Sequence, residues 1–185
     1  MNKINSLILI CGGLWLSTKI ILSNLVDPST NVMVGVMINL FFVLIVAFFS
    51  IREAERKRTK AESNMLDDIK STAKNTIKYV LLATFLIAAY YYVISPEEVD
   101  YRKSERTEMV MEALGTDEAF EELKQTQPEL KNMKREELLQ KELDNIEFIF
   151  SPFLQVTLSL IALLAAAIFY SILVTVLWRK LMSPS

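Results

Sequence analysis

The sequence predicts an all-α integral membrane protein with four transmembrane helices and a helical extracytoplasmic segment. Hydrophobic residues make up 52% of the 185-residue chain, although 20 Lys and Arg and 22 Asp and Glu are also present. The two classes are separated along the chain, because the apolar residues form four blocks of about 20 residues, the length that spans a bilayer. A single soluble core is therefore excluded, and we predict one membrane domain that covers residues 1–185.

The first two apolar blocks predict a hairpin of membrane-spanning helices. They cover about residues 4–26 and 32–51, and residues 27–31 between them are enough only for a tight turn. At 1.5 Å of rise per residue, each block is about 30 Å long, which matches the hydrocarbon core of a bilayer. Asp27 and Pro28 are expected to cap the hairpin on one side of the membrane.

A basic helical loop at residues 52–76 follows the hairpin. Opposite charges at three- and four-residue spacing extend the second helix into water. Ser63 or Asn64 is expected to cap a third helix, which runs into the third span at residues 77–94. The early part of this helix is amphipathic, with Met65 and other apolar residues at helical spacing, and is expected to lie along the membrane surface.

An acidic helical segment is predicted at residues 95–150. Ser95, Pro96 and Glu98 are the residue types of a capping box, which starts a helix directly after the third span. Further helices are expected within the segment, which ends before Pro152 at the start of the last span. The fourth span covers about residues 152–178.

The charges of the loops predict the orientation. Residues 51–78 carry eight basic and five acidic residues, whereas residues 96–148 carry eight basic and sixteen acidic residues. Lys3, Arg179 and Lys180 add to the basic side, and short loops rich in Lys and Arg stay in the cytoplasm. We therefore predict a multi-pass protein of the cytoplasmic (inner) membrane, with both termini and the basic loop in the cytoplasm.

The composition removes most enzymatic chemistry. The chain has no His, the commonest general base and metal ligand near neutral pH, and its one Cys, Cys11, lies inside the first span. No phosphate-binding glycine loop, G-x-S-x-G or H-E-x-x-H motif occurs in the sequence. We predict no enzyme, no catalytic residue, no cofactor and no metal site. The net charge of −2 also predicts no nucleic-acid partner.

Lys19 lies in the second half of the first span, where a charge costs about 2.5–3.5 kcal/mol on insertion scales. Its long side chain can snorkel to the outer interface, about 10 Å away along the helix, or pack inside the bundle. Alternatively, Lys19 marks an ion or proton path. No Asp or Glu lies within the four spans, and this absence argues against a proton relay.

Small and polar residues predict where helices touch. Asn39 shares a face of the second span with Gly35, Val43 and Ala47, so it can form an interhelical hydrogen bond of about 0.6 kcal/mol. Other small residues with the same implication are Gly12, Gly13, Ala167, Ser171 and Thr175. The contacts lie either within the chain or with a second copy.

Residues at the two membrane surfaces have both a ligand-binding interpretation and a simpler one. Tyr90, Tyr91 and Tyr92 fit an aromatic belt at the outer interface or a stacking platform. Basic side chains contribute about 1 kcal/mol each near an anionic membrane surface, although they also set topology without any ligand. The candidates for contact with anionic lipid are Arg56, Lys57, Arg58 and Lys60.

Three stretches carry a resemblance to a known family. They are residues 66–74, the end of the third span at residues 90–94, and Ser151-Pro152-Phe153 at the start of the last span. In these stretches and in the order of its elements, the chain resembles an uncharacterised bacterial family of small inner-membrane proteins, domain of unknown function family 4199. The resemblance implies the same four-span arrangement with an acidic helical segment and implies no established activity.

These observations favour a small non-enzymatic membrane interaction or accessory protein. It would assemble through transmembrane helix packing, as a homo-oligomer or within a larger membrane complex. The alternative is a transporter or channel subunit in which Lys19 and Asn39 line an intramembrane polar path. The lipid bilayer is the partner that the sequence predicts most directly.

Overall fold

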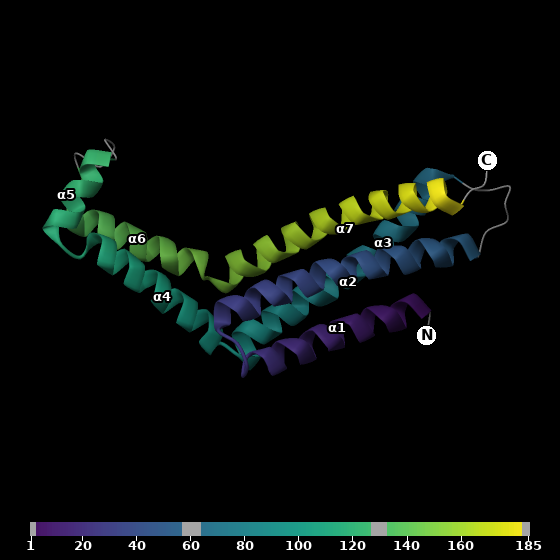
Figure 1. The fold of residues 1–185 in the computed structure, drawn as a ribbon, viewed down its shortest axis with the longest axis horizontal. Helices are drawn as coiled ribbons and strands as arrows, with labels where there is room; N and C mark the ends of the chain where they lie inside the picture. The colour runs from purple at the N-terminus through teal and green to yellow at the C-terminus, as the bar shows by residue number, and fades with distance from the viewer. Residues whose placement is uncertain (1–2, 57–63, 127–132, 183–185) are drawn as a thin grey trace. The chain divides into compact units, whose positions relative to one another are not determined.

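The computed structural model is helical throughout its regular elements in the part of the chain that it describes (Figure 1). The described residues are 3–56, 64–126 and 133–182. The chain divides into two compact units: residues 1–90 with 156–185, here called the membrane unit, and residues 91–155, here called the acidic unit.

In the described part of the chain, four helices are long and apolar enough to cross a membrane. They are α1 (Lys3–Leu22), α2 (Pro28–Arg56), α3 (Met65–Ala89) with its π-helical continuation η2 (Tyr90–Ile94), and α7 (Pro152–Met182). Figure 1 shows them as long, roughly parallel rods that lie side by side. The predictions of an all-α fold and of a multi-pass membrane protein are therefore confirmed.

All four long helices contribute to the core of the membrane unit. Because their outer faces meet lipid in a membrane, the buried residues form one stripe on each helix. Members of the core are Ile8 and Cys11 of α1, Val43 and Val46 of α2, Tyr79, Val80 and Ala83 of α3, and Leu163 and Ala167 of α7.

Helix α1 ends at Leu22, earlier than the predicted residue 26. Two side chains just beyond this end donate hydrogen bonds to the carbonyl of Ile20: the Ser23 hydroxyl at 2.8 Å and the Asn24 amide at 3.1 Å. Such local bonds satisfy a carbonyl that a further helical turn would use, and they compete with helix. Apolar character alone therefore overestimates the length of α1.

Helix α2 begins at Pro28, directly after its cap, Asp27. The Asp27 carboxylate accepts a hydrogen bond from the backbone N–H of Thr30 at 2.9 Å, and proline fits the first position of the helix. Because hydrogen bonds from Thr30 stabilise the carboxylate, the pKa of Asp27 is lower than its ordinary value. The cap therefore stays charged at neutral pH.

Helix α3 has Asn64 as its cap, and its side-chain oxygen accepts from the backbone N–H of Leu66 at 3.1 Å. The other predicted cap, Ser63, lies outside the described residues. The expectation that this part of α3 lies along the membrane surface stays a prediction. Met65 is 40% exposed, and the buried residues of this part are polar, beginning with Asp68. The reason is the polar contact that α3 makes with α7, described below.

The acidic unit contains α4 (Glu97–Leu114), α5 (Asp117–Thr126) and α6 (Arg135–Ile149). Helices α4 and α6 lie side by side (Figure 1). Leu114, Phe120 and Leu138, one from each helix, form a small apolar core. An ion pair between Lys103 and Glu147, at 3.1 Å, adds to the contact between α4 and α6.

The predicted capping box at the start of α4 is wrong. Pro96 occupies the cap position without a side-chain cap, and the Ser95 hydroxyl donates to the Glu97 carboxylate. A hydroxyl bonds more strongly to a charged carboxylate than it does to a backbone amide. The bond from Ser95 lowers the pKa of Glu97 from its ordinary value.

The two adjacent glycines of α1 differ in what surrounds them. A Cβ atom on Gly12 would lie 2.9 Å from Leu82 Cδ2 and 3.0 Å from Leu86 Cδ1, whereas a Cβ on Gly13 would meet nothing within 4 Å. The absence of a side chain at Gly12 thus lets α1 approach α3 closely. This contact lies within the chain.

Valine at Gly12 is therefore expected to destabilise the membrane unit by about 1–3 kcal/mol, the usual cost of an overpacked core. Leu14→Val, at an exposed position of the same helix, is the control and is expected to change the free energy of unfolding by no more than about 0.5 kcal/mol. Thermal unfolding of both variants in the same detergent measures the difference. Equal midpoints would contradict the close approach of α1 to α3.

Candidate functional site

Polar and aromatic side chains from α1, α2 and η2 meet inside the membrane unit. We call them the Lys19 cluster: Trp15 and Lys19 of α1, Asn31 and Gly35 of α2, and Tyr90 of η2. All five residues are buried, and Lys19 is only 1% exposed. In the structure, the Lys19 side chain therefore packs inside the bundle and does not snorkel to the outer interface.

Tyr90 connects the members of the Lys19 cluster. The ammonium nitrogen of Lys19 lies 4.7 Å from the centroid of the Tyr90 ring, a cation–π distance. The Tyr90 hydroxyl donates to the backbone carbonyl of Lys19 and accepts from the Asn31 amide, both at 3.3 Å. One side chain thereby contacts both α1 and α2.

Trp15 closes the other side of the Lys19 cluster. Its ring lies edge-on to Tyr90, with centroids 6.1 Å apart and an interplanar angle of 76°. Its indole N–H donates to the backbone carbonyl of Gly35 at 2.9 Å. A Cβ on Gly35 would lie 2.9 Å from Lys19 Cδ, so the glycine provides the space that the lysine side chain occupies.

In the Lys19 cluster, the free energy gained from the cation–π contact nearly balances the cost of burying the lysine charge. A cation–π contact contributes about 2 kcal/mol or more where it is desolvated, and a lysine inside a span costs about 2.5–3.5 kcal/mol. The Tyr90 ring therefore offsets most of the cost of placing Lys19 in the bundle. A carboxylate is not needed for this, which fits the absence of Asp and Glu from the four predicted spans.

Asn39 contacts a different aromatic residue. It is 2% exposed, and its side-chain oxygen accepts a hydrogen bond from the Tyr79 hydroxyl at 2.7 Å. Tyr79 lies edge-on to Phe42, with ring centroids 6.3 Å apart. Asn39 thus makes an interhelical bond, between α2 and α3.

A second polar feature joins α3 to α7, and we call it the α3–α7 ladder. Polar residues recur every fourth position on both helices, and because the helices are antiparallel they fall opposite each other. Two pairs are in contact, Asp68 with Arg179 and Thr76 with Ser171, and the four-residue spacing puts Thr72 and Thr175 between them in the sequence of each helix.

The two outer pairs of the ladder are bonded. Arg179 donates to the Asp68 carboxylate through Nε at 2.9 Å and also through a terminal nitrogen. The hydroxyls of Thr76 and Ser171 are 3.1 Å apart. The two middle hydroxyls, on Thr72 and Thr175, have no hydrogen-bond partner among the described residues. The outer pairs therefore provide the polar attraction between α3 and α7.

The candidate lipid contacts are only partly within the described chain. Arg56 is the last residue of α2, and its side chain is 64% exposed with an ion pair to Glu53 at 3.8 Å. Lys57, Arg58 and Lys60 lie outside the described residues. The ligand and topology interpretations of this group both stay predictions.

Sequence reasoning missed Tyr90 and the α3 half of the ladder. The sequence predicts Tyr90 in an aromatic belt or a stacking platform at the membrane surface, whereas the residue is fully buried. The available signal was that Lys19 needs a partner and that the spans contain no acid. For the ladder, the signal was the four-residue spacing of Asp68, Thr72 and Thr76.

Comparison with protein-family models, curated proteins and solved structures finds no match to this chain. Its relation to domain of unknown function family 4199 therefore stays a prediction.

Proposed function

We propose that this chain is a small non-enzymatic accessory protein that acts by assembling with other membrane proteins. One observation carries the proposal: the two polar residues suited to line a path, Lys19 and Asn39, are 1% and 2% exposed and pack against Tyr90 and Tyr79. An interior filled by its own side chains suits a membrane anchor better than a water-filled passage.

The proposed location is the cytoplasmic (inner) membrane, with both termini inside the cell. The start of α1, the ends of α2 and α7 and the start of α3 lie at one end of the membrane unit (Figure 1). Lys3, Arg56 and Arg179 belong to these helix ends, and Lys and Arg favour the cytoplasmic side. Reporter fusions at residue 120 test the orientation, and a cytoplasmic signal there would contradict it.

Self-association is proposed through α1. Gly12, Gly35 and Ser171 pack within the chain, so these small residues are already used. Gly13 and Ser17 are exposed and one helical turn apart, which is the small-xxx-small spacing of helix dimers.

Purification in a mild detergent, with mass determination and identification of co-purifying proteins, tests the assembly. We expect a homo-oligomer or a complex with other membrane proteins, and Gly13→Ile is expected to dissociate the homo-oligomer. Leu14→Ile, at a neighbouring exposed position, is the control that leaves it intact. A lone monomer without any partner would contradict the proposal.

The second candidate function is a transporter or channel subunit, and the charge of Lys19 inside the bundle favours it. Lys19→Met separates the two functions, because methionine fills similar space without charge. For an accessory protein, we expect the variant to be as stable as the parent or more stable by about 1 kcal/mol, the difference between insertion cost and cation–π gain. A conductance in proteoliposomes that Lys19→Met abolishes, with assembly intact, would favour the channel subunit.

A further inference from the structure

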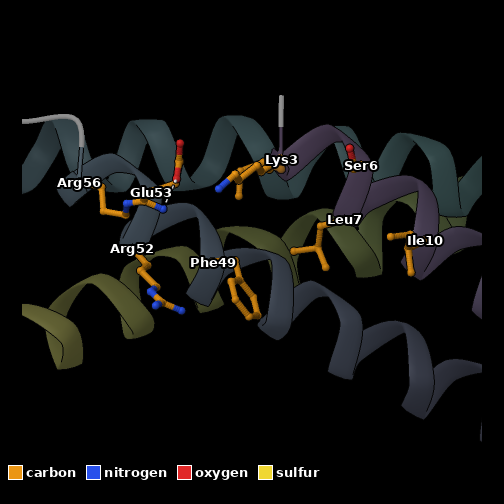
Figure 2. Close-up of a pocket in the computed structure, with 9 residues that line it drawn as sticks. Lys3, Ser6, Leu7, Ile10, Phe49, Arg52, Glu53 and Arg56 are labelled. Atoms are coloured by element: carbon orange, nitrogen blue, oxygen red, sulfur yellow. Dashed lines mark ion pairs between the residues drawn. The ribbon is translucent and has the colours of Figure 1, made fainter. Parts of the chain in front are cut away.

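A cavity of about 460 Å³ lies between the start of α1 and the end of α2 (Figure 2). Charged side chains gather at one end of it and apolar side chains at the other, as Figure 2 shows. All of its lining residues belong to the membrane unit. The cavity is therefore amphipathic along the axis of the helices.

The charged end has an excess of positive charge. Lys3, Arg52 and Arg56 line it together with one carboxylate, Glu53. Arg56 and Glu53 are 3.8 Å apart, which is a long ion pair, and Arg56 is 64% exposed. The three basic residues outnumber the one carboxylate, so the net charge of this end is +2. Arginine can also bind a phosphate with two parallel hydrogen bonds.

The apolar end faces the surface that lipid covers in a membrane. Leu7, Ile10 and Phe49 line it, and Ile10 and Phe49 are 57% and 39% exposed. Ile10 follows Lys3 by about two helical turns, which corresponds to about 10 Å along α1 at 1.5 Å per residue. This separation matches the step from a phospholipid phosphate to the upper part of its acyl chains.

We propose that the cavity binds one anionic phospholipid. Its phosphate lies among Lys3, Arg52 and Arg56, and its acyl chains lie along Ile10 and Phe49. The first turn of α1 lines the same end, and the positive end of its dipole adds to the attraction for an anion. This site is more specific than the surface charge contact expected from the sequence, and it requires only that α1 and α2 span a membrane.

The charged end would recognise a phosphate group, which a phospholipid and a free phosphate ester both carry. Ile10 and Phe49 favour the lipid, because its acyl chains bury this exposed apolar surface and a free phosphate ester has no apolar part that does so. The test therefore needs probes with and without acyl chains.

Native mass spectrometry of the purified full-length chain tests the proposal. The probes are phosphatidylglycerol, zwitterionic phosphatidylethanolamine and glycerol 1-phosphate. We expect phosphatidylglycerol to bind more tightly than the other two. Arg52→Gln with Arg56→Gln is expected to weaken this binding roughly 30-fold, from the typical contribution of two basic residues near an anionic lipid. The matched control, Lys70→Gln with Lys74→Gln, removes two exposed charges from α3 and is expected to leave binding unchanged.

A second pair of variants tests the apolar end and does not depend on the arginines. Ile10→Ser is expected to weaken phosphatidylglycerol binding, whereas Leu14→Ser, one turn further along α1 and 53% exposed, is not. Equal binding of the two phospholipids, or equal loss in the Lys70 and Lys74 control, would overturn the proposal. Tight binding of glycerol 1-phosphate that Ile10→Ser leaves unchanged would assign the cavity to a free phosphate ester and overturn the lipid assignment.

Discussion

Replacing Arg179 with methionine is expected to destabilise the membrane unit by about 1.5–3 kcal/mol, the usual contribution of hydrogen bonds to a charged group. Arg179 makes two hydrogen bonds to the Asp68 carboxylate, whose side chain is only 7% exposed. Without the guanidinium, that carboxylate loses these two hydrogen bonds in a poorly solvated place. The midpoint of thermal unfolding in detergent measures the effect.

Two further variants show whether the loss comes from the ion pair. Lys180→Met removes a neighbouring exposed charge and is expected to cost no more than about 0.5 kcal/mol. The double variant Asp68→Asn with Arg179→Met is expected to recover part of the stability, because it removes both charges of the pair. If Arg179→Met unfolds no more easily than Lys180→Met, the ion pair does not hold α7 against α3.

The spans were predictable because length and apolar character are local properties of a sequence. A run such as residues 32–51 has few alternatives to a helix in lipid, since every backbone polar group needs a partner there. Local chemistry also explains where prediction failed. Ser23 and Asn24 end α1 early through bonds to Ile20, and their residue types favour such bonds, but hydropathy does not report them.

The candidate site was less predictable because its contacts join residues that are far apart in the chain. The position of Lys19 in a span identifies it as a candidate, whereas the sequence predicts that Tyr90, 71 residues later, lies at the membrane surface. The four-residue spacing on α7 predicted that a helix packs there, but it did not identify α3 as the neighbour. A face on one helix specifies a contact only when the opposing face is known, and a single sequence does not provide the pairing.

Replacing Tyr90 with alanine is expected to destabilise the membrane unit by about 3–5 kcal/mol, as for other fully buried aromatic residues. The change removes the ring that faces the Lys19 ammonium and the hydroxyl that bonds to Asn31 and to the Lys19 carbonyl. Tyr90→Phe keeps the ring and is expected to cost only about 1–3 kcal/mol, the range for losing a buried hydrogen bond. Thermal unfolding in detergent measures both variants.

A double-mutant cycle shows whether Tyr90 compensates the charge of Lys19 or only fills space. If the ring offsets the charge, Lys19→Met in the Tyr90→Ala background is expected to raise stability by about 2 kcal/mol more than it does in the parent, which is the size of a desolvated cation–π contact. If Tyr90 only fills space, Lys19→Met changes stability equally in the parent and in the Tyr90→Ala variant. The ring would then interact equally well with the charged ammonium of lysine and the neutral thioether of methionine. Additive effects would therefore remove the cation–π explanation for how a lysine is kept inside this bundle.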